Sequence, residues 1–222
     1  MRAGEILSLA VQAGIAPGVS VLDLCCGVAG PGRFITSQLG CTYLGLDSSA
    51  SAIELARGRA GDLPCRFEVA QVPPVPPGPF DVVLLLETLL AFPDKARLLR
   101  GIASALTIGG RFAFTVEEGA PLTAAERTAM PDAETVWLVP LSDLLAGLEH
   151  VGLQASWVQE CSTSHQAMVD ALISAFVAEQ AAITAHIGRR ALDELLAAHQ
   201  LWSDWLRHGR VRKFAIVADR TC

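Results

Sequence analysis

The chain has 222 residues, of which 51% are hydrophobic and 18% are charged, and its formal net charge is −6 at pH 7. This length fits one domain with a full apolar core, and the composition excludes a disordered chain. The acidic balance argues against a nucleic-acid partner, because a duplex-sized phosphate footprint needs a basic face.

The first two thirds of the chain alternate short helices with apolar strands. Ser49 or Ser51 is the expected cap of the third helix, and the Gly109–Gly110 pair is expected to end the fourth. A proline-rich connector at 72–79 should be stiff and extended. The predicted order is helix 3–13, strand 20–25, helix 30–39, strand 42–46, helix 48–59, strand 66–70, strand 80–87, helix 93–106 and strand 111–116.

The last third predicts a helix at 141–150 with Ser142 as its cap, a strand at 153–161, helical periodicity over 162–210 and a final strand at 211–217. Helices alternating with strands at this spacing indicate a doubly wound α/β sheet with right-handed crossovers. A last strand entering from the edge at which the sixth strand leaves must be antiparallel. We therefore expect a mostly parallel, seven-stranded Rossmann-like sheet in one domain, residues 1–222, with a core of 1–161 and 211–222 and a helical lid at 162–210.

Membrane and metal sites are not predicted. No apolar run is long enough to span a bilayer and no cleavable signal is visible, so we expect no membrane partner. The six cysteines form neither a C-x-x-C pair nor a Cys/His metal spacing. They predict reduced thiols and a cytoplasmic location.

The turn after the first strand is the centre of the pattern. It runs Val21-Leu22-Asp23-Leu24-Cys25-Cys26-Gly27-Val28-Ala29-Gly30-Pro31-Gly32-Arg33, an apolar strand followed by small residues that open a helix. Small residues let the backbone approach a ligand, and N–H groups at the start of the helix face it. The glycine order is G-x-x-G-x-G, whereas a dinucleotide fingerprint needs G-x-G-x-x-G, so the spacing disfavours NAD.

This run resembles motif I of the class I S-adenosylmethionine-dependent methyltransferases, V-L-D-L-G-C-G-x-G, and its subgroup that continues as G-G-P-A-R. Cys25 stands where that motif has its first glycine, and Ala29 stands where it has its third. The resemblance covers nearly the whole chain. It implies S-adenosyl-L-methionine as cofactor and methyl transfer to a small-molecule acceptor.

Asp47 is the strongest candidate for a cofactor contact. It lies 20 residues beyond Gly27 at the end of the second strand, where a carboxylate can accept both hydroxyls of a ribose. The alternative is that it caps the following helix. The resemblance implies that Asp23 orders the loop and approaches the methionine end of the cofactor, and the alternative is a structural anchor of the loop.

Other cofactor contacts follow at the remaining strand ends. The resemblance aligns Gln71 with an adenine-binding Asp, and Val72 would form an apolar wall. Glu87 could face the cationic sulfonium, and Arg33 repeats the arginine of G-G-P-A-R and could bind the cofactor carboxylate. Each has an ordinary structural alternative. The full candidate set is Asp23, Cys25, Gly27, Gly30, Arg33, Asp47, Ser48, Gln71, Val72 and Glu87.

Methyl transfer needs a base only if the nucleophile arrives protonated, and alignment supplies much of the rate. Glu117 and Glu118, after the fifth strand, and His165, after the sixth, are within reach. Glu118 and His165 are the catalytic candidates, with an ordinary structural role as the alternative for each. His199 falls on an apolar helical stripe and is expected to be a satisfied core or lid residue.

The segment 162–210 must cross the ligand edge of the sheet, because the sixth strand ends there and the last strand begins there. Two amphipathic helices with Gly188 between them predict a lid. Trp202, Trp205 and Trp137 are expected to shape an apolar acceptor chamber. In the alternative, the helices cover the sheet's end or form the contact of a homodimer.

These features predict a cytoplasmic small-molecule methyltransferase. One alternative is the same fold with another reaction, and a second is a cofactor-free scaffold subunit of a partner enzyme. Fold analogy alone does not separate them, because function resides in the site.

Overall fold

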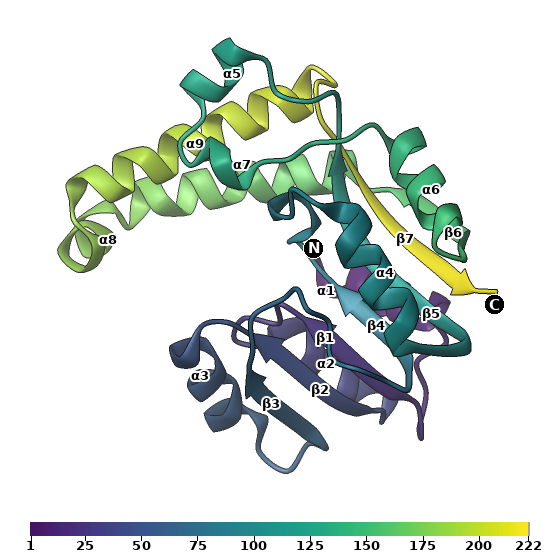
Figure 1. Cartoon of the computed structure of the whole chain (residues 1–222). Helices are drawn as coiled ribbons and strands as arrows, with labels where there is room; N and C mark the ends of the chain where they lie inside the picture. Colours follow the sequence, from purple (N-terminus) through teal and green to yellow (C-terminus); the bar gives the residue numbers. More distant parts are fainter. Residues whose placement is uncertain (222) are drawn as a thin grey trace.

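The computed structural model describes residues 1–221, and within them seven strands form one mixed sheet in the order β3-β2-β1-β4-β5-β7-β6 (Figure 1). Neighbouring strands from β3 to β5 are parallel, whereas β7 is antiparallel to both β5 and β6. The predicted sheet with an antiparallel last strand is confirmed. The strands are β1 (Ser20–Leu24), β2 (Thr42–Asp47), β3 (Cys65–Val69), β4 (Phe80–Leu85), β5 (Leu106–Glu118), β6 (Leu153–Glu160) and β7 (Arg212–Arg220).

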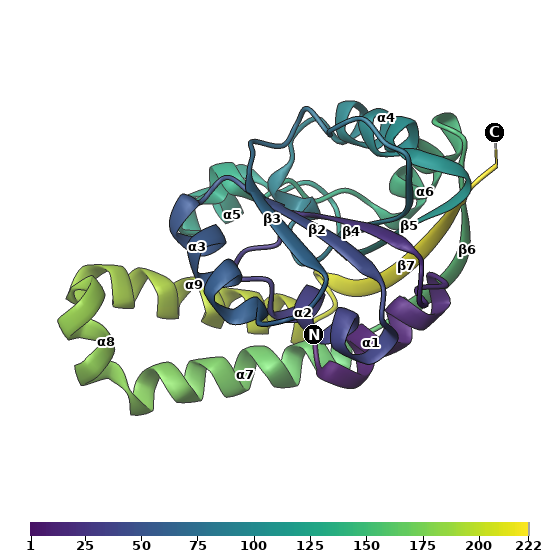
Figure 2. The ribbon, with the colours of Figure 1, turned by 90° about the horizontal axis from the view of Figure 1, so that it is seen from below.

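Helices cover both faces of the sheet (Figure 2). One face packs against α1 (Ala3–Gln12), α2 (Gly30–Leu39) and α3 (Ala50–Ala60), and the other against α4 (Lys95–Ala105) and α6 (Leu141–His150). Central strands therefore bury both sets of alternating side chains, which explains their continuous apolar sequence.

Helix caps agree with the prediction in one case and differ in another. The Ser49 side chain accepts a hydrogen bond from the Ala52 N–H and caps α3 as expected. The predicted cap of α6, Ser142, is wrong: the residue before the helix is Pro140, which makes no side-chain cap.

The Gly109–Gly110 pair does not end a helix. Strand β5 begins at Leu106, directly after α4, so both glycines lie inside the strand. They sit beside a register shift between β4 and β5, where a Cβ on Gly110 would lie 2.9 Å from the Thr107 carbonyl oxygen. Close backbone approach at a bulge explains the glycine there.

Short elements and a helical arm complete the chain. The sheet edge carries η1 (Leu89–Ala91), α5 (Ala124–Ala129) and η2 (Ala133–Thr135). Residues 162–207 form three helices where two were expected, and we call them the arm: α7 (Ser162–Ala178), α8 (Gln180–Ile187) and α9 (Arg189–Arg207). Helices α7 and α9 run side by side, with α8 at the projecting tip (Figures 1 and 2).

The arm has its own apolar core at its base, where Val169, Trp205 and Leu206 pack against the segment after β5. In the described part of the chain, no single helix combines the length and apolarity needed to span a bilayer. Helices α7 and α8 together meet that test, but they bend by 82° at their junction.

The turn between β1 and α2 contains strained backbone. Cys25, Gly27 and Ala29 have φ angles of 59°, 54° and 54°, in the left-handed region that favours glycine. A non-glycine residue there costs roughly 1–2 kcal/mol. Cys25 and Ala29, the two departures from the glycine pattern, therefore adopt the conformation that glycine would adopt.

This strain makes a testable contrast between adjacent cysteines. Cys25→Gly should be more stable than Cys25→Ala by about 1 kcal/mol, because glycine relieves the left-handed strain. At Cys26, which is outside that region, the order should reverse. Urea denaturation of the four variants measures both differences. Alanine being the more stable replacement at both positions would contradict the strain.

Candidate functional site

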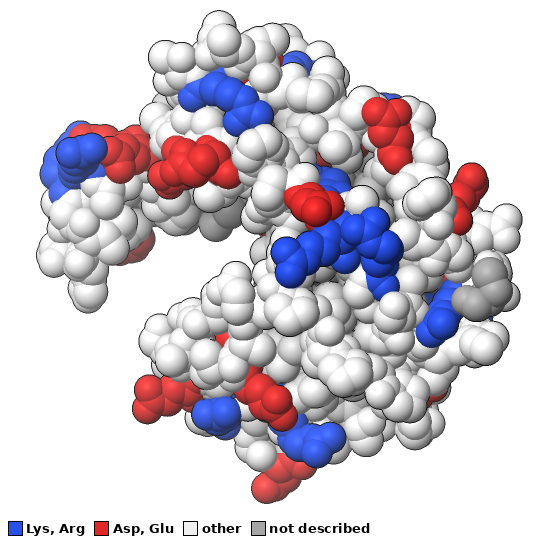
Figure 3. All heavy atoms as spheres, in the orientation of Figure 1, with Lys and Arg blue, Asp and Glu red and all other residues white. Residues whose placement is uncertain are grey.

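The carboxyl ends of β1, β2 and β4 point toward the arm. The surface is hollowed between the arm and this edge, and the walls of the hollow carry few charged side chains (Figure 3). In doubly wound sheets ligands bind outside the carboxyl ends of the strands. The functional site is therefore expected in this hollow.

Asp47 joins β2 to the glycine turn. Its Oδ2 accepts a hydrogen bond from the Gly27 N–H at 2.8 Å, and its Oδ1 accepts one from the Ser49 N–H at 2.8 Å. Each carboxylate oxygen keeps a second lone pair. Asp47 therefore holds the turn and the start of α3 while it remains able to accept hydroxyl donors.

Asp23 lies beneath the same turn and is only 3% exposed. The Tyr43 hydroxyl donates to its Oδ2 at 2.5 Å. Burial raises the pKa of Asp23 to about 7, and although the Tyr43 hydrogen bond lowers it, the charge of Asp47 raises it further. This geometry fits the loop-anchor alternative better than a direct ligand contact.

The remaining candidates around the turn differ in their access to the hollow. A Cβ placed on Gly27 or Gly30 would meet nothing within 4 Å, so both face open space. Ser48 and Gln71 are exposed, and Val72 is 6% exposed within the core. Cys25 is half-buried against the same core.

Arg33 points away from this edge. Its guanidinium Nη1 donates to the Arg59 carbonyl at 3.0 Å, near the carboxyl end of α3 and the far edge of the sheet. The expected contact with a cofactor carboxylate therefore has no support in this geometry. Helix α2 places the residue on the side of α3 rather than over the turn.

A group of ionisable side chains, buried except for Glu87, lies where β4, β5, β7 and α7 meet. We call Glu87, Glu117, His165 and Lys213 the Lys213 cluster. The Lys213 Nζ donates to Glu87 Oε2 at 2.8 Å and to Glu117 Oε1 at 2.5 Å. Lys213 is 1% exposed, and although burial lowers its pKa, the two carboxylates raise it above the ordinary value. The lysine therefore stays charged.

Glu87 is thus paired with Lys213, whereas a free carboxylate facing the sulfonium of the cofactor was expected. Its backbone has φ of 63°, and its N–H donates to the Thr115 hydroxyl at 2.7 Å. Burial raises its pKa, but Lys213 and the Met1 amino group, 3.8 Å from Oε1, bring it below the ordinary value.

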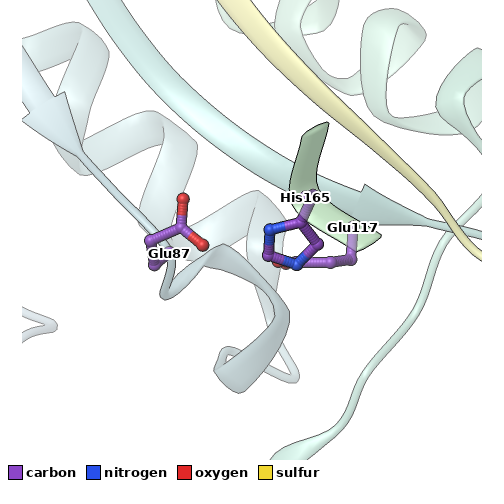
Figure 4. Close-up of side chains that lie close together, drawn as sticks. All are labelled: Glu87, Glu117 and His165. Atoms are coloured by element: carbon purple, nitrogen blue, oxygen red, sulfur yellow. The ribbon is translucent and has the colours of Figure 1, made fainter. Parts of the chain in front are cut away.

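His165 lies beside the two carboxylates (Figure 4). It is 7% exposed, and its Nε2 is 3.6 Å from Glu117 Oε1. Burial lowers the pKa of His165 to about 4, with Lys213 as the next cause and the charge of Glu87 opposing. The imidazole is therefore neutral at pH 7 and can accept a proton.

The two glutamates and His165 could also be arranged for a metal, since their ligand atoms lie within 4.8 Å of one another. The Lys213 ammonium, however, contacts both carboxylates. A divalent cation would have to displace this lysine or lie beside its charge. The arrangement is that of an ion-pair network.

Glu118 makes structural contacts through both of its carboxylate oxygens. Its Oε1 accepts a hydrogen bond from Arg212 Nε at 2.6 Å, and its Oε2 accepts one from the Leu141 N–H at 3.2 Å. The carboxylate therefore caps the start of α6, the role predicted for Ser142. A helix start and a cross-strand arginine thus give Glu118 a structural role, which was the alternative to the expected catalytic one.

An apolar cavity of about 320 Å³ opens between α7, α9, η1 and the segment after β5, and we call it the arm pocket. Trp202 lines it, whereas Trp205 packs 5.6 Å behind Trp202 in the core of the arm. Trp137 is 36% exposed and does not line the cavity, contrary to expectation. Its polar lining is His165 and His199.

His199 is satisfied within its own helix, as expected: its Nδ1 lies 2.8 Å from the Leu195 carbonyl oxygen, and its ring packs edge-on against Phe176. His165 is thus the polar group that joins the arm pocket to the Lys213 cluster.

Comparison with protein families matches residues 22–112 to the family described as a methyltransferase domain. These residues include the glycine turn, Asp47 and strands β2 to β4. This match confirms the expected resemblance to the class I S-adenosylmethionine-dependent methyltransferases.

Among curated proteins, the chain is 32% identical to 27-O-demethylrifamycin SV methyltransferase of Amycolatopsis mediterranei over 65% of this chain and 57% of that protein. The chain spans 20 to 57% of the length of four curated relatives that it matches.

Solved structures show the same fold. The cyclopropane synthase MmaA2 from Mycobacterium tuberculosis aligns with a TM-score of 0.89 at 14% identity, over 97% of this chain and 83% of that one. Phosphoethanolamine N-methyltransferase 2 from Haemonchus contortus, in complex with S-adenosyl-L-methionine, aligns with a TM-score of 0.84 at 18% identity, over 99% of this chain and 53% of that one.

Sequence reasoning missed Lys213. The residue falls in an alternating strand at an inward position, where lysine is rarely buried unless paired. Its partner follows from the antiparallel register, which places Lys213 opposite Glu117. The signal was a charged residue at an inward strand position, next to a strand that ends in two glutamates.

The role of Glu118 can be tested by stability. Glu118→Ala should lower the free energy of unfolding by about 1–3 kcal/mol, because it leaves the Leu141 N–H without its acceptor. Glu118→Gln keeps an acceptor for this N–H, so its free energy of unfolding should fall by less. Urea denaturation gives both values. Unchanged stability in the alanine variant would contradict the structural role.

The neutral state of His165 makes stability depend on pH. The unfolded chain binds a proton with a pKa near 6.5, and folding lowers that pKa to about 4, so stability should fall as pH drops from 6.5 toward 4. Between pH 7 and pH 5 this loss is on the order of 2 kcal/mol.

Urea denaturation of the parent and of His165→Gln at both pH values isolates this loss, since the variant lacks the group. The matched control is His150→Gln, at an exposed position outside the cluster. An identical pH dependence in the parent and in His165→Gln would show that His165 does not fold in its neutral form.

Proposed function

We propose that this chain binds S-adenosylmethionine at the carboxyl edge of β1, β2 and β4 and transfers its methyl group to a small molecule in the arm pocket. The observation that carries the proposal is the contact between Asp47 and the Gly27 N–H. It holds the glycine turn against the acidic end of β2, within the segment that matches the methyltransferase domain.

The residues present fit the cofactor. Gly27 and Gly30 leave open space where side chains would otherwise stand, and Asp47 lies at the rim of that space. Asp47 would accept the ribose hydroxyls, Val72 would form an apolar wall for the adenine, and Gln71 would accept from the adenine amino group. Asp23 supports this arrangement from below, through Tyr43.

When bound, the cofactor supplies an activated methyl group, whose transfer to an acceptor oxygen breaks the sulfur–methyl bond, returns its electron pair to sulfur and releases the acceptor's proton. His165 is placed to take that proton, because it is neutral and lines the arm pocket. Glu117, 3.6 Å from Nε2, would stabilise the resulting imidazolium.

The arm would act as the lid of this site, with residues 1–161 and 211–222 as the core and 162–210 as the lid. Its two long helices place Met168, Val169 and Trp202 over the pocket. An apolar cover keeps water away from the reacting atoms. Cys222, in the last part of this division, lies outside the described residues.

The names of the relatives support a small-molecule acceptor. Those relatives include a rifamycin methyltransferase and several phosphoethanolamine methyltransferases. The proposal also places the reaction in the cytoplasm, which the five described cysteines support, since all are free thiols.

The proposal predicts a defined loss on removal of one carboxylate. Asp47→Ala should weaken binding of S-adenosylhomocysteine by roughly 1.5–3 kcal/mol, the range for hydrogen bonds to a charged group. Calorimetry measures the affinity, and mass spectrometry after incubation with S-adenosylmethionine and metabolite pools follows methyl transfer. Asp62→Ala, at an exposed position after α3, is the matched control and should bind as the parent does.

An affinity unchanged in Asp47→Ala would place the ribose elsewhere. Absence of heat with either form of the cofactor would overturn the proposal and leave the scaffold alternative. Cofactor binding with no methylated product in any metabolite pool would favour another reaction on the same fold.

A further inference from the structure

The walls of the arm pocket are apolar over nearly all of their extent. Met168, Val169 and Leu172 of α7 face Trp202 of α9, and Leu90 of η1 closes the side nearest the sheet. At about 320 Å³ the cavity is near the lower end of the range of about 300–1,000 Å³ for small-molecule sites. It therefore fits a compact apolar body.

No lysine, arginine, aspartate or glutamate lines this cavity within residues 1–221. Among the described residues, two cations lie near the pocket, and both already face carboxylates. The Lys213 ammonium behind His165 is bonded to Glu87 and Glu117, and the Met1 amino group, which contacts Met168, lies 3.8 Å from Glu87 Oε1. A phosphate or carboxylate entering the pocket would lose its water without gaining a counterion, which is strongly unfavourable. The cavity consequently selects against anionic acceptors.

The polar end of the cavity suits a ligand that donates a hydrogen bond. His165 lines it, and Glu117, directly behind that ring, has an Oε2 atom that is buried and without a hydrogen-bond partner. Glu117 is 4% exposed. Buried polar atoms are normally satisfied, so this orphaned acceptor indicates a donor that arrives with the ligand.

We infer that the acceptor is an uncharged molecule with a compact apolar body and a hydroxyl group, which the arm pocket holds with the hydroxyl toward His165 and Glu117. This inference rests on the proposed function and names the class of its substrate. An ammonium at the same place would lie beside the Lys213 charge, so a protonated amine fits less well.

The test uses three molecules with one ring system: 2-naphthol, 2-naphthyl phosphate and 2-naphthoate. Calorimetry first establishes that S-adenosylhomocysteine binds, and each probe is then titrated into the protein saturated with it. We expect 2-naphthol to bind at least tenfold more tightly than either anion. 2-Naphthylmethylamine, protonated at pH 7, should also bind at least tenfold more weakly than 2-naphthol.

A cation placed in the pocket should reverse the preference. Leu172 is 38% exposed and lines the cavity, so Leu172→Lys can be introduced without burying a charge in the core. Relative to 2-naphthol, 2-naphthyl phosphate should bind at least tenfold more tightly to this variant than to the parent. The control is Val177→Lys on the same helix, 52% exposed and outside the cavity lining, which should keep the parental preference.

The results distinguish a failure of the proposed function from a failure of the acceptor class. Failure of S-adenosylhomocysteine to bind overturns the proposed function and, with it, this inference. If the cofactor product binds but the parent takes an anion or the amine as tightly as 2-naphthol, the acceptor class is wrong and cofactor binding stands. An equal change in Leu172→Lys and Val177→Lys also overturns the inference, because the effect would not come from the pocket.

Discussion

The buried Lys213 ammonium bonds to carboxylates from two separate parts of the chain that meet at the site. It reaches Glu117 across the antiparallel pair of β5 and β7, and it reaches Glu87 beyond the end of β4. Removing one partner of a buried ion pair typically costs about 3–5 kcal/mol, because the remaining charge is left uncompensated. The register of β7 is therefore coupled to the positions of both carboxylates. The chain enters β7 directly after α9, so the end of the arm is coupled to the same register.

The same cluster links the carboxyl end of β4, which Glu87 follows, to the arm pocket, which His165 lines. Glu87 precedes η1, whose Leu90 lines the pocket, and its left-handed backbone turns the chain between the two regions. The hydroxyl of Thr115 in β5 accepts the Glu87 N–H and fixes that turn. A charged network thus sets the geometry of a pocket whose own walls are apolar, with His165 as the side chain common to both.

The parallel half of the sheet could be predicted because its local signals agree with its tertiary structure. Glycine spacing and the position of Asp47 depend only on the chain between two adjacent strands. The antiparallel half depends on contacts between residues far apart in sequence. Glu118 was expected to be a base because it follows a strand, but its neighbours Arg212 and Leu141 are determined by the β5–β7 pairing and by the placement of α6. Periodicity likewise could not show the break between α7 and α8.

Sharing the fold does not fix the reaction, since a cyclopropane synthase and a phosphoethanolamine methyltransferase both align with nearly all of this chain. In the proposed function the glycine turn and Asp47 bind the cofactor, and they say little about the acceptor. The arm connects two adjacent antiparallel strands, β6 and β7, and its base has a separate apolar core. Its lining can therefore differ without disturbing the sheet. The proposed function accordingly assigns the choice of acceptor to the arm, and it assigns the alignment of the acceptor with the core to His165, which lies in the Lys213 cluster.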